Sequence, residues 1–256
     1  MICIVTAAPI EFSTAAGLLT ECSYSDEAGM AVCRGRFADQ QVTILKSEVG
    51  AHGFAVRLAA HLRSNRYEAL LVAGLAGALD PKLKAGDAVV FDLCYNARSS
   101  GHPVVSSDDK LSHFITRTLL ESGRECFRGA GVTVDRIVTS AKEKVELGAR
   151  YRAAAVDMET YDSLSVCADF GLSAAALRVV SDDAVSDLPD FNRALEPDGR
   201  MNKGRMALAM IRNPFNSIRF LLGINGVLSS LRDGLRVIFR GLPGELRMVD
   251  KGGSSG

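Results

Sequence analysis

The stretch "ALLVAGLAGAL", residues 69–79, decides how the rest of the sequence is interpreted. It is apolar throughout and ends in small residues, which is typical of a strand that is buried on both faces of a sheet. Further apolar runs at 2–8, 42–50, 87–96, 135–140 and 173–182 are predicted strands as well. Amphipathic helical patterns at 53–65 and 110–123 separate them. This alternation predicts an α/β fold of three layers, with helices on both faces of a central sheet.

The composition excludes several classes of protein. The 256 residues are 47% hydrophobic and 23% charged, as in one large or two small globular domains. The 30 basic and 30 acidic residues balance, so overall charge gives no reason to expect a nucleic-acid partner. The six cysteines have no metal-ligand spacing, and we expect no metal and no cofactor. The N-terminus is neither a signal peptide nor a membrane span, which favours a cytoplasmic protein.

Acidic and small residues stand at the carboxyl ends of the predicted strands. Glu11 follows the first strand, the Gly-rich segment "GLAG", 74–77, ends the third, and Ser181 and Asp182 end the last. Ligands of open α/β sheets bind beyond these ends. The sequence therefore predicts a pocket that several carboxylates face and that has little space for side chains near its wall.

The segment "AAAVDMETYDSL", residues 153–164, places two more acids where a small apolar strand turns into a helix. Carboxylates at a helix start are favoured by the free N–H groups and the helix dipole. Helix capping alone would therefore explain both Asp157 and Glu159.

Three segments, in sequence order, resemble the nucleoside phosphorylase/nucleosidase superfamily. "VAGLAGALDPKLKAGDAVV", 72–90, is similar to its Gly-rich loop and the strand that follows. "AVDMETYDSLSVC", 155–167, is similar to its ribose-binding Met-Glu segment, and "LRVVSDDA", 177–184, to the Arg-x-x-Ser-Asp segment that carries its catalytic Asp. The start "TAAPIEF" resembles the nucleosidase branch. The resemblance implies a catalytic domain over residues 1–190 with a mixed, partly barrel-like central sheet.

The resemblance implies cleavage of a purine N-glycosidic bond, with adenine as the expected base. Asp182 would be the general acid at purine N7, oriented by Ser181, and burial beside other acids would favour its proton. Glu159 would bind the ribose hydroxyls, leaving Asp157 as the capping residue, and Glu11 would activate a water. The other expected substrate-binding residues are Met158, Gly74, Ala76, Gly77 and Arg178.

Several alternatives remain open. Met158 is equally consistent with core packing, Arg178 with an ion pair, and the Ser-Asp pair with a turn. Leu75 stands where many superfamily members carry a phosphate-binding Ser, which favours water as the nucleophile over phosphate as a co-substrate. A phosphorolytic enzyme and a non-catalytic nucleoside-binding module are the alternatives. The charged residues 142–144 stand where adenosine-type nucleosidases have an apolar wall for the base.

A C-terminal helical extension is predicted over residues 191–245, followed by a disordered tail at 246–256. The Arg-punctuated apolar run 206–242 predicts two or three helices, broken at Pro214 and at the glycines. This region resembles the hopanoid-associated branch of the superfamily, whose proposed task is removal of adenine from adenosylhopane. The helices could cover the sheet, form a dimer face or contact the membrane peripherally. A homo-oligomer, with a dimer favoured, is expected from the family.

Overall fold

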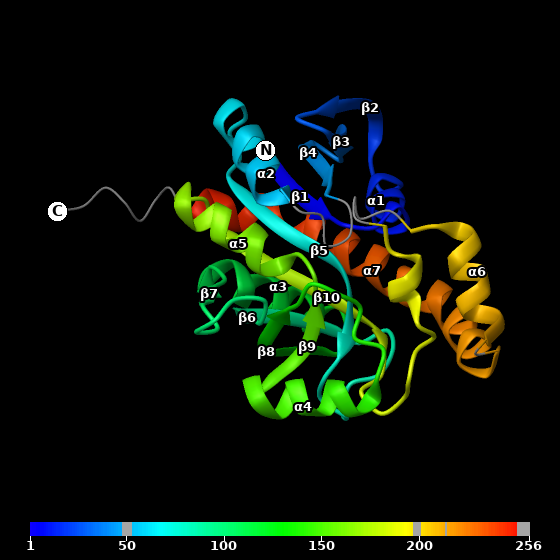
Figure 1. Ribbon diagram of the computed structural model, residues 1–256. Coiled ribbons are helices and arrows are strands. Elements are labelled where there is room, and N and C mark those ends of the chain that lie inside the picture. The colour runs from blue at the N-terminus through cyan, green and yellow to red at the C-terminus, as the bar shows by residue number, and fades with distance from the viewer. Residues whose placement is uncertain (48–52, 197–200, 213, 250–256) are drawn as a thin grey trace.

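The computed structural model describes residues 1–47, 53–196, 201–212 and 214–249 (Figure 1). A ten-stranded mixed sheet forms its centre and helices cover both sides, which confirms the predicted α/β class. The strands are β1 (Ile2–Thr6), β2 (Thr20–Glu27), β3 (Met30–Phe37), β4 (Gln40–Lys46), β5 (Ala69–Ala78), β6 (Ala88–Asn96), β7 (Val104–Ser106), β8 (Cys126–Thr133), β9 (Ala153–Asp157) and β10 (Ala174–Asp182). The helices are α1 (Pro9–Ala16), α2 (Phe54–Ser64), α3 (Asp109–Glu121), α4 (Ala141–Tyr151), α5 (Thr160–Asp169), α6 (Lys203–Arg212) and α7 (Pro214–Val249), with a 3₁₀ turn at Phe191–Ala194.

Part of the sheet closes into a barrel. β5 pairs with both β10 and β9, and the ring is completed by β10 with β6, β6 with β8 and β8 with β9. The remaining strands β1, β4, β3 and β2 extend from β5 as an open sheet. The partly barrel-like centre is thus confirmed. Because the parallel strands β1, β5 and β10 run together, their carboxyl ends meet at one edge.

The predicted strand at 135–140 is wrong. β8 ends at Thr133, and the chain that follows is irregular up to Ser140, where α4 begins. Its backbone is satisfied by a side chain, since Ile137 N donates to Asn192 Oδ1 at 2.8 Å and Asn192 Nδ2 returns a bond of 2.8 Å to the Ile137 carbonyl. A segment bonded in this way needs no partner strand.

The C-terminal region forms two helices in the described residues. The break predicted at Pro214 is present, but α7 continues through its glycines, contrary to expectation. The later half of α7 belongs to the main core, in contact with α1, α3 and the sheet. Its buried core residues are Val227, Leu231, Leu235, Ile238 and Phe239. Of the expected disordered tail, residues 250–256 lie outside the described residues. Among the described helices, none is long and apolar enough to cross a membrane.

Candidate active site

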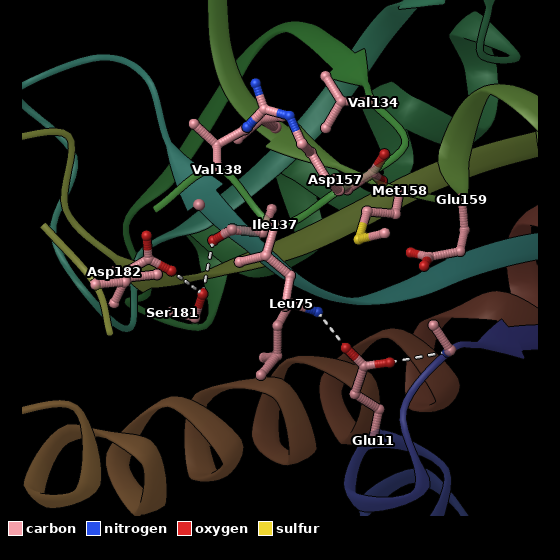
Figure 2. A pocket seen from close by; sticks show the side chains of 16 residues that line it. Glu11, Leu75, Val134, Ile137, Val138, Asp157, Met158, Glu159, Ser181 and Asp182 are labelled. Atoms are coloured by element: carbon pink, nitrogen blue, oxygen red, sulfur yellow. Dashed lines mark hydrogen bonds between the residues drawn. The ribbon is translucent and has the colours of Figure 1, made fainter. Parts of the chain in front are cut away.

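A cavity lies at the carboxyl ends of β1, β5, β9 and β10, and most of the predicted site residues line it. In Figure 2, Asp182 and Ser181 lie at one end, Glu159 at the other, Met158 between them and Glu11 on a third side. The predicted residues that line the cavity are Glu11, Ala76, Gly77, Met158, Glu159, Ser181 and Asp182. Gly74 and Arg178 are not among the lining residues. Both lie behind the cavity wall, where they position other residues of the site.

Glu11 is held rigidly by backbone N–H groups. Its Oε2 accepts hydrogen bonds of 2.9 Å from both Ala7 N and Ala8 N, and its Oε1 accepts one of 2.7 Å from Leu75 N. Glu11 is the third residue of α1, so its bond to Ala8 is also half of a capping box. The buried carboxylate thus joins the start of α1 to the end of β5.

Gly74 provides space between two charged side chains. A Cβ at this position would lie 2.6 Å from Arg178 Nη1 and 2.7 Å from Glu11 Oε1. Both distances are far inside a normal contact, so only glycine lets the arginine and the glutamate approach β5. Gly74 therefore positions other site residues, and its predicted direct contact with substrate is revised.

Arg178 is a buried anchor behind the cavity. Its Nη2 lies 2.6 Å from Asp157 Oδ2 and 3.7 Å from Glu159 Oε2, and both Nε and Nη2 donate to Thr160 Oγ1, at 3.0 and 2.8 Å. Burial lowers the pKa of Arg178, but Asp157, Glu159 and Glu11 more than offset this, so the pKa is raised overall. The guanidinium is held by these groups and does not line the cavity, so we assign it to positioning of the acids rather than to the predicted contact with substrate.

Asp157 and Glu159 have different tasks although they are two residues apart. Asp157 Oδ1 accepts hydrogen bonds from Thr133 Oγ1 at 2.7 Å and from Thr160 N at 3.3 Å, so it stabilises the start of α5 as expected and also pairs with Arg178. Glu159 occupies the N-cap position of α5, but its side chain makes no capping bond. Its carboxylate faces the cavity. Helix capping therefore accounts for Asp157 and does not account for Glu159.

Asp182 is contacted from two sides. Ser181 Oγ donates to Asp182 Oδ1 at 2.5 Å, which fixes the carboxylate, and also contacts the Ala76 carbonyl at 3.2 Å. The Lys144 Nζ lies 2.6 Å from Asp182 Oδ2 as an ion pair without aligned hydrogen-bond geometry. Gly77 leaves space here, because a Cβ would lie 3.2 Å from Oδ2. Acids were expected beside Asp182, and the neighbouring charge is a buried lysine instead.

One wall of the cavity is apolar, and most of it comes from the segment between β8 and α4, part of which was predicted as a strand. The side chains that form it are Val134, Ile137, Val138, Val156 and Leu188. The charged residues 142–144 stand where adenosine-type nucleosidases have an apolar wall, so the sequence did not identify the side chains that contact the base. Within that segment Lys142 is exposed, Glu143 pairs with Arg136 at 2.6 Å, and Lys144 is buried against Asp182. An apolar wall is therefore present in the cavity, and its residues Val134, Ile137 and Val138 precede α4 rather than lying on it.

A model of the phosphorylase superfamily matches residues 1–212 of this chain. The chain belongs to the phosphorylase superfamily. As a member it is an enzyme, and the match spans every cavity-lining residue named above.

Three individual superfamily members that match this chain share less than a quarter of its residues. The chain is 23% identical over 192 residues to the 5′-methylthioadenosine/S-adenosylhomocysteine nucleosidase of Staphylococcus saprophyticus, covering 70% of this chain and 82% of that protein. It is similar to the structure of the nucleosidase of the same name from Neisseria meningitidis in complex with methylthio-immucillin-A, with a TM-score of 0.72 and 18% identity over 93% of this chain and 97% of the other. It is also similar to futalosine hydrolase of Helicobacter pylori, with a TM-score of 0.68 and 17% identity over 98% and 97%. At these identities the structural likeness establishes the fold.

Proposed function

We propose that this phosphorylase-superfamily enzyme hydrolyses the N-glycosidic bond of an adenine nucleoside. The observation that carries the proposal is the placement of three carboxylates, Asp182, Glu159 and Glu11, on three sides of one cavity. Bond cleavage needs an acid at the base, an anion near the sugar and a base for the water. The nucleosidase relative from Staphylococcus saprophyticus supports the choice of an adenine nucleoside.

Asp182 is the general acid in this proposal. When the bond between C1′ and the base breaks, its electron pair moves to the base, and a proton at N7 neutralises the departing anion. Ser181 fixes one oxygen of Asp182 at 2.5 Å, and the apolar wall across the cavity suits a flat purine ring. A general acid in such a position contributes about 10² to 10⁴ in rate.

Glu159 holds the ribose. A carboxylate can accept hydrogen bonds from both the 2′ and 3′ hydroxyls, and its negative charge stabilises the cationic sugar of the transition state. Arg178 lies 3.7 Å behind it and fixes its direction. Met158 lies beside it in the cavity wall and packs against the sugar.

Glu11 takes a proton from the attacking water. The water oxygen bonds to C1′ as the base leaves, and one water proton passes to the carboxylate. Two features favour water over phosphate. The Leu75 N–H is already donated to Glu11, and the anionic carboxylate would repel a phosphate beside it. Arg136, the basic side chain among the described lining residues, is paired with Glu143 at 2.6 Å.

Product analysis tests the reaction. The purified protein is incubated with 5′-methylthioadenosine and with adenosine, in phosphate-free buffer and with added phosphate. We expect free adenine and free sugar in both buffers. Adenine release that depends strictly on phosphate, with a sugar 1-phosphate product, would replace hydrolysis by phosphorolysis. Tight binding without any base release would instead identify a nucleoside-binding module.

A finer proposal concerns the group attached to the ribose, for which we propose a polycyclic lipid, as in adenosylhopane. α6 and the first half of α7 carry exposed apolar side chains, which are Leu208, Ile211, Ile218, Leu221 and Leu222. A neighbouring hollow is lined by Arg193, Arg205 and Arg212 together with Asp190, Leu208 and Ala209. α7 also runs past Glu11 and Leu75, and Leu75 packs against the core that includes Val227. An apolar surface with a basic flank suits an anionic membrane surface, from which such a substrate would be taken.

Substitutions test the lipid proposal better than truncation does, because a chain that ended near Gly204 would lose the core residues of α7. In the Ile211→Gln/Leu222→Gln variant we expect weaker co-sedimentation with vesicles containing anionic lipid and a selective loss of activity on a lipid-linked nucleoside. The matched control is Val56→Gln, an equally exposed apolar residue on α2. Unchanged lipid binding and an unchanged preference for the lipid-linked over the soluble nucleoside would contradict the lipid proposal. A change from dimer to monomer on sedimentation would make the surface a dimer face.

A further inference from the structure

We infer that Lys144 is a positioning residue that holds the proton which Asp182 delivers to the leaving base. The inference deepens the proposed hydrolysis and rests on it. Its starting point is the 2.6 Å contact between Lys144 Nζ and Asp182 Oδ2. Asp182 reaches the cavity, while Lys144 stands behind it and does not line the cavity.

The ammonium of Lys144 is completely buried. An ammonium removed from water is costly unless an opposite charge and hydrogen-bond acceptors compensate it. Here the Asp183 carbonyl accepts from Nζ at 2.8 Å, and the Ser186 carbonyl accepts at 3.3 Å. Asp182 supplies the negative charge. The loop after β10 therefore wraps around Nζ, and Asp182 is the carboxylate that the ammonium contacts.

Other charged groups near this pair are directed elsewhere. The carboxylates of Asp183 and Asp187 accept from the backbone N–H groups of Val185 and Ala141. On the helix that carries Lys144, Glu143 pairs with Arg136. Three further groups lie across the cavity or behind it, namely Glu11, Glu159 and the Arg178–Asp157 ion pair. Lys144 and Asp182 thus form a separate pair at the end of the cavity where the base would lie.

Such a pair can deliver one proton. Before reaction the proton resides on the Lys144 ammonium and Asp182 is a carboxylate. As the glycosidic bond breaks, a rotation of the carboxylate brings Oδ2 into line with an N–H of Lys144, Asp182 receives that proton, and N7 takes a proton from Asp182. Lys144 is left as a neutral amine, and the base leaves neutral. The pair regains a proton from solvent through the cavity, and Glu11 returns to solvent the proton it took from water, so the overall balance is one water consumed.

Two substitutions separate proton supply from simple packing. Lys144→Arg keeps the charge, but a guanidinium does not give up its proton, so Asp182 stays locked as a carboxylate. We expect its kcat/KM to fall by about a hundredfold or more at every pH, the loss typical of a missing general acid. Lys144→Met removes the charge and leaves Asp182 to hold a proton alone. We expect its kcat/KM to fall about tenfold or more at pH 8 and to recover toward pH 5.5, with the alkaline limb moved to lower pH.

A purely structural lysine predicts the opposite order. Lys144→Arg would then be the more active variant, and both variants would keep the pH profile of the parent. Lys142→Met is the matched control on the same helix, because this lysine is exposed and its pair with Glu146 spans 3.9 Å. Circular dichroism and thermal unfolding report whether each variant is folded.

The outcomes distinguish the inference from the proposed function. If the parent releases no base from any nucleoside, the proposed hydrolysis fails and the inference fails with it. If the parent is active and the profiles of parent and variants coincide in shape, only the inference is overturned. If Lys144→Met does not fold, Lys144→Arg decides alone, and near-parent activity in that variant overturns the inference.

Discussion

Two buried cations serve this site, and they are surrounded differently. Arg178 meets two carboxylates and a hydroxyl directly, with Glu11 close by, and has no access to the cavity. Lys144 meets one carboxylate, Asp182, which does line the cavity. An excess of acids around a guanidinium makes a permanent anchor. A single acid beside an ammonium makes a pair whose proton can move, because lysine can lose its proton and arginine does not. The number of carboxylate partners and the type of cation therefore distinguish a structural residue, Arg178, from a residue that can take part in proton transfer, Lys144.

The largest effect is expected on the anchor side of this comparison. Arg178→Met leaves Asp157 and Glu159 as buried carboxylates without their cation. Breaking a buried ion pair from one side costs about 3–5 kcal/mol, so the free energy of unfolding in urea should fall by that amount. The control is Arg117→Met, whose exposed contact with Glu121 spans 3.9 Å. It should change stability by less than about 1 kcal/mol. Equal stability of the two variants would show that Arg178 is no anchor.

The next effect is on the reactive side. Asp182→Asn keeps the shape of the side chain but cannot donate an acidic proton. We expect kcat to fall by about a hundredfold or more while nucleoside binding survives, measured by single-turnover base release and by calorimetry. Asp183→Asn is the neighbouring control. If the asparagine variant at 182 turns over near normally and the one at 183 does not, the acid has been assigned to the wrong residue.

A smaller effect is expected for the carboxylate that faces both the anchor and the cavity. Glu159→Gln keeps hydrogen-bonding capacity but loses charge, so we expect about a tenfold rise in KM for a ribonucleoside. Removal of the 2′ hydroxyl from the substrate should lower kcat/KM by a smaller factor in this variant than in the parent. The two penalties are compared in a double-substitution cycle, and simple additivity would mean that Glu159 does not contact the 2′ hydroxyl.

The smallest effect concerns a buried base that remains neutral. Burial lowers the pKa of His61 below 6.5, although Glu27 lies 3.3 Å away and opposes the shift. Because the unfolded chain takes up the proton more readily, this histidine contributes stability above pH 6.5 that is lost as pH falls through its folded pKa. The free energy of unfolding in urea should be higher at pH 7.5 than at pH 5.5. This difference should be smaller in His61→Asn, by about 1 kcal/mol or less. An unchanged difference would assign the pH dependence to other groups.

The sequence allowed prediction of the carboxylates more readily than of their surroundings. Asp182, Glu159 and Glu11 stand at strand ends within recognisable segments, and the topology of a parallel sheet brings such ends together. Lys144 was not predicted, because in an amphipathic helix with Lys142 and Glu143 a lysine reads as solvated. Only the fold of the loop after β10 shows that it is buried. The residue pattern therefore predicts the carboxylates at the edge of the sheet, but it does not predict the lysine that is buried behind Asp182.

Local patterns also misled where tertiary contacts decide the conformation. Residues 135–140 include the β-branched Ile137, Val138 and Thr139 and were predicted as a strand, yet the backbone of Ile137 is bonded to Asn192. β2 was missed for the opposite reason. It is exposed along nearly its whole length, so it lacks the alternation of apolar and polar residues that marks a half-buried strand.

The place of α7 in the core has a consequence for biosynthesis. Its residues from Val227 to Phe239 pack against β-strands and helices that all precede them in the chain. During translation the part of the sheet face that α7 packs on and that α1 and α3 do not cover therefore remains open after every described strand has emerged from the ribosome. Apolar side chains of this core, such as Leu177 on β10 and Ile115 on α3, lack their full packing until α7 is released. This core is therefore completed only after all the segments that line the cavity have been synthesised.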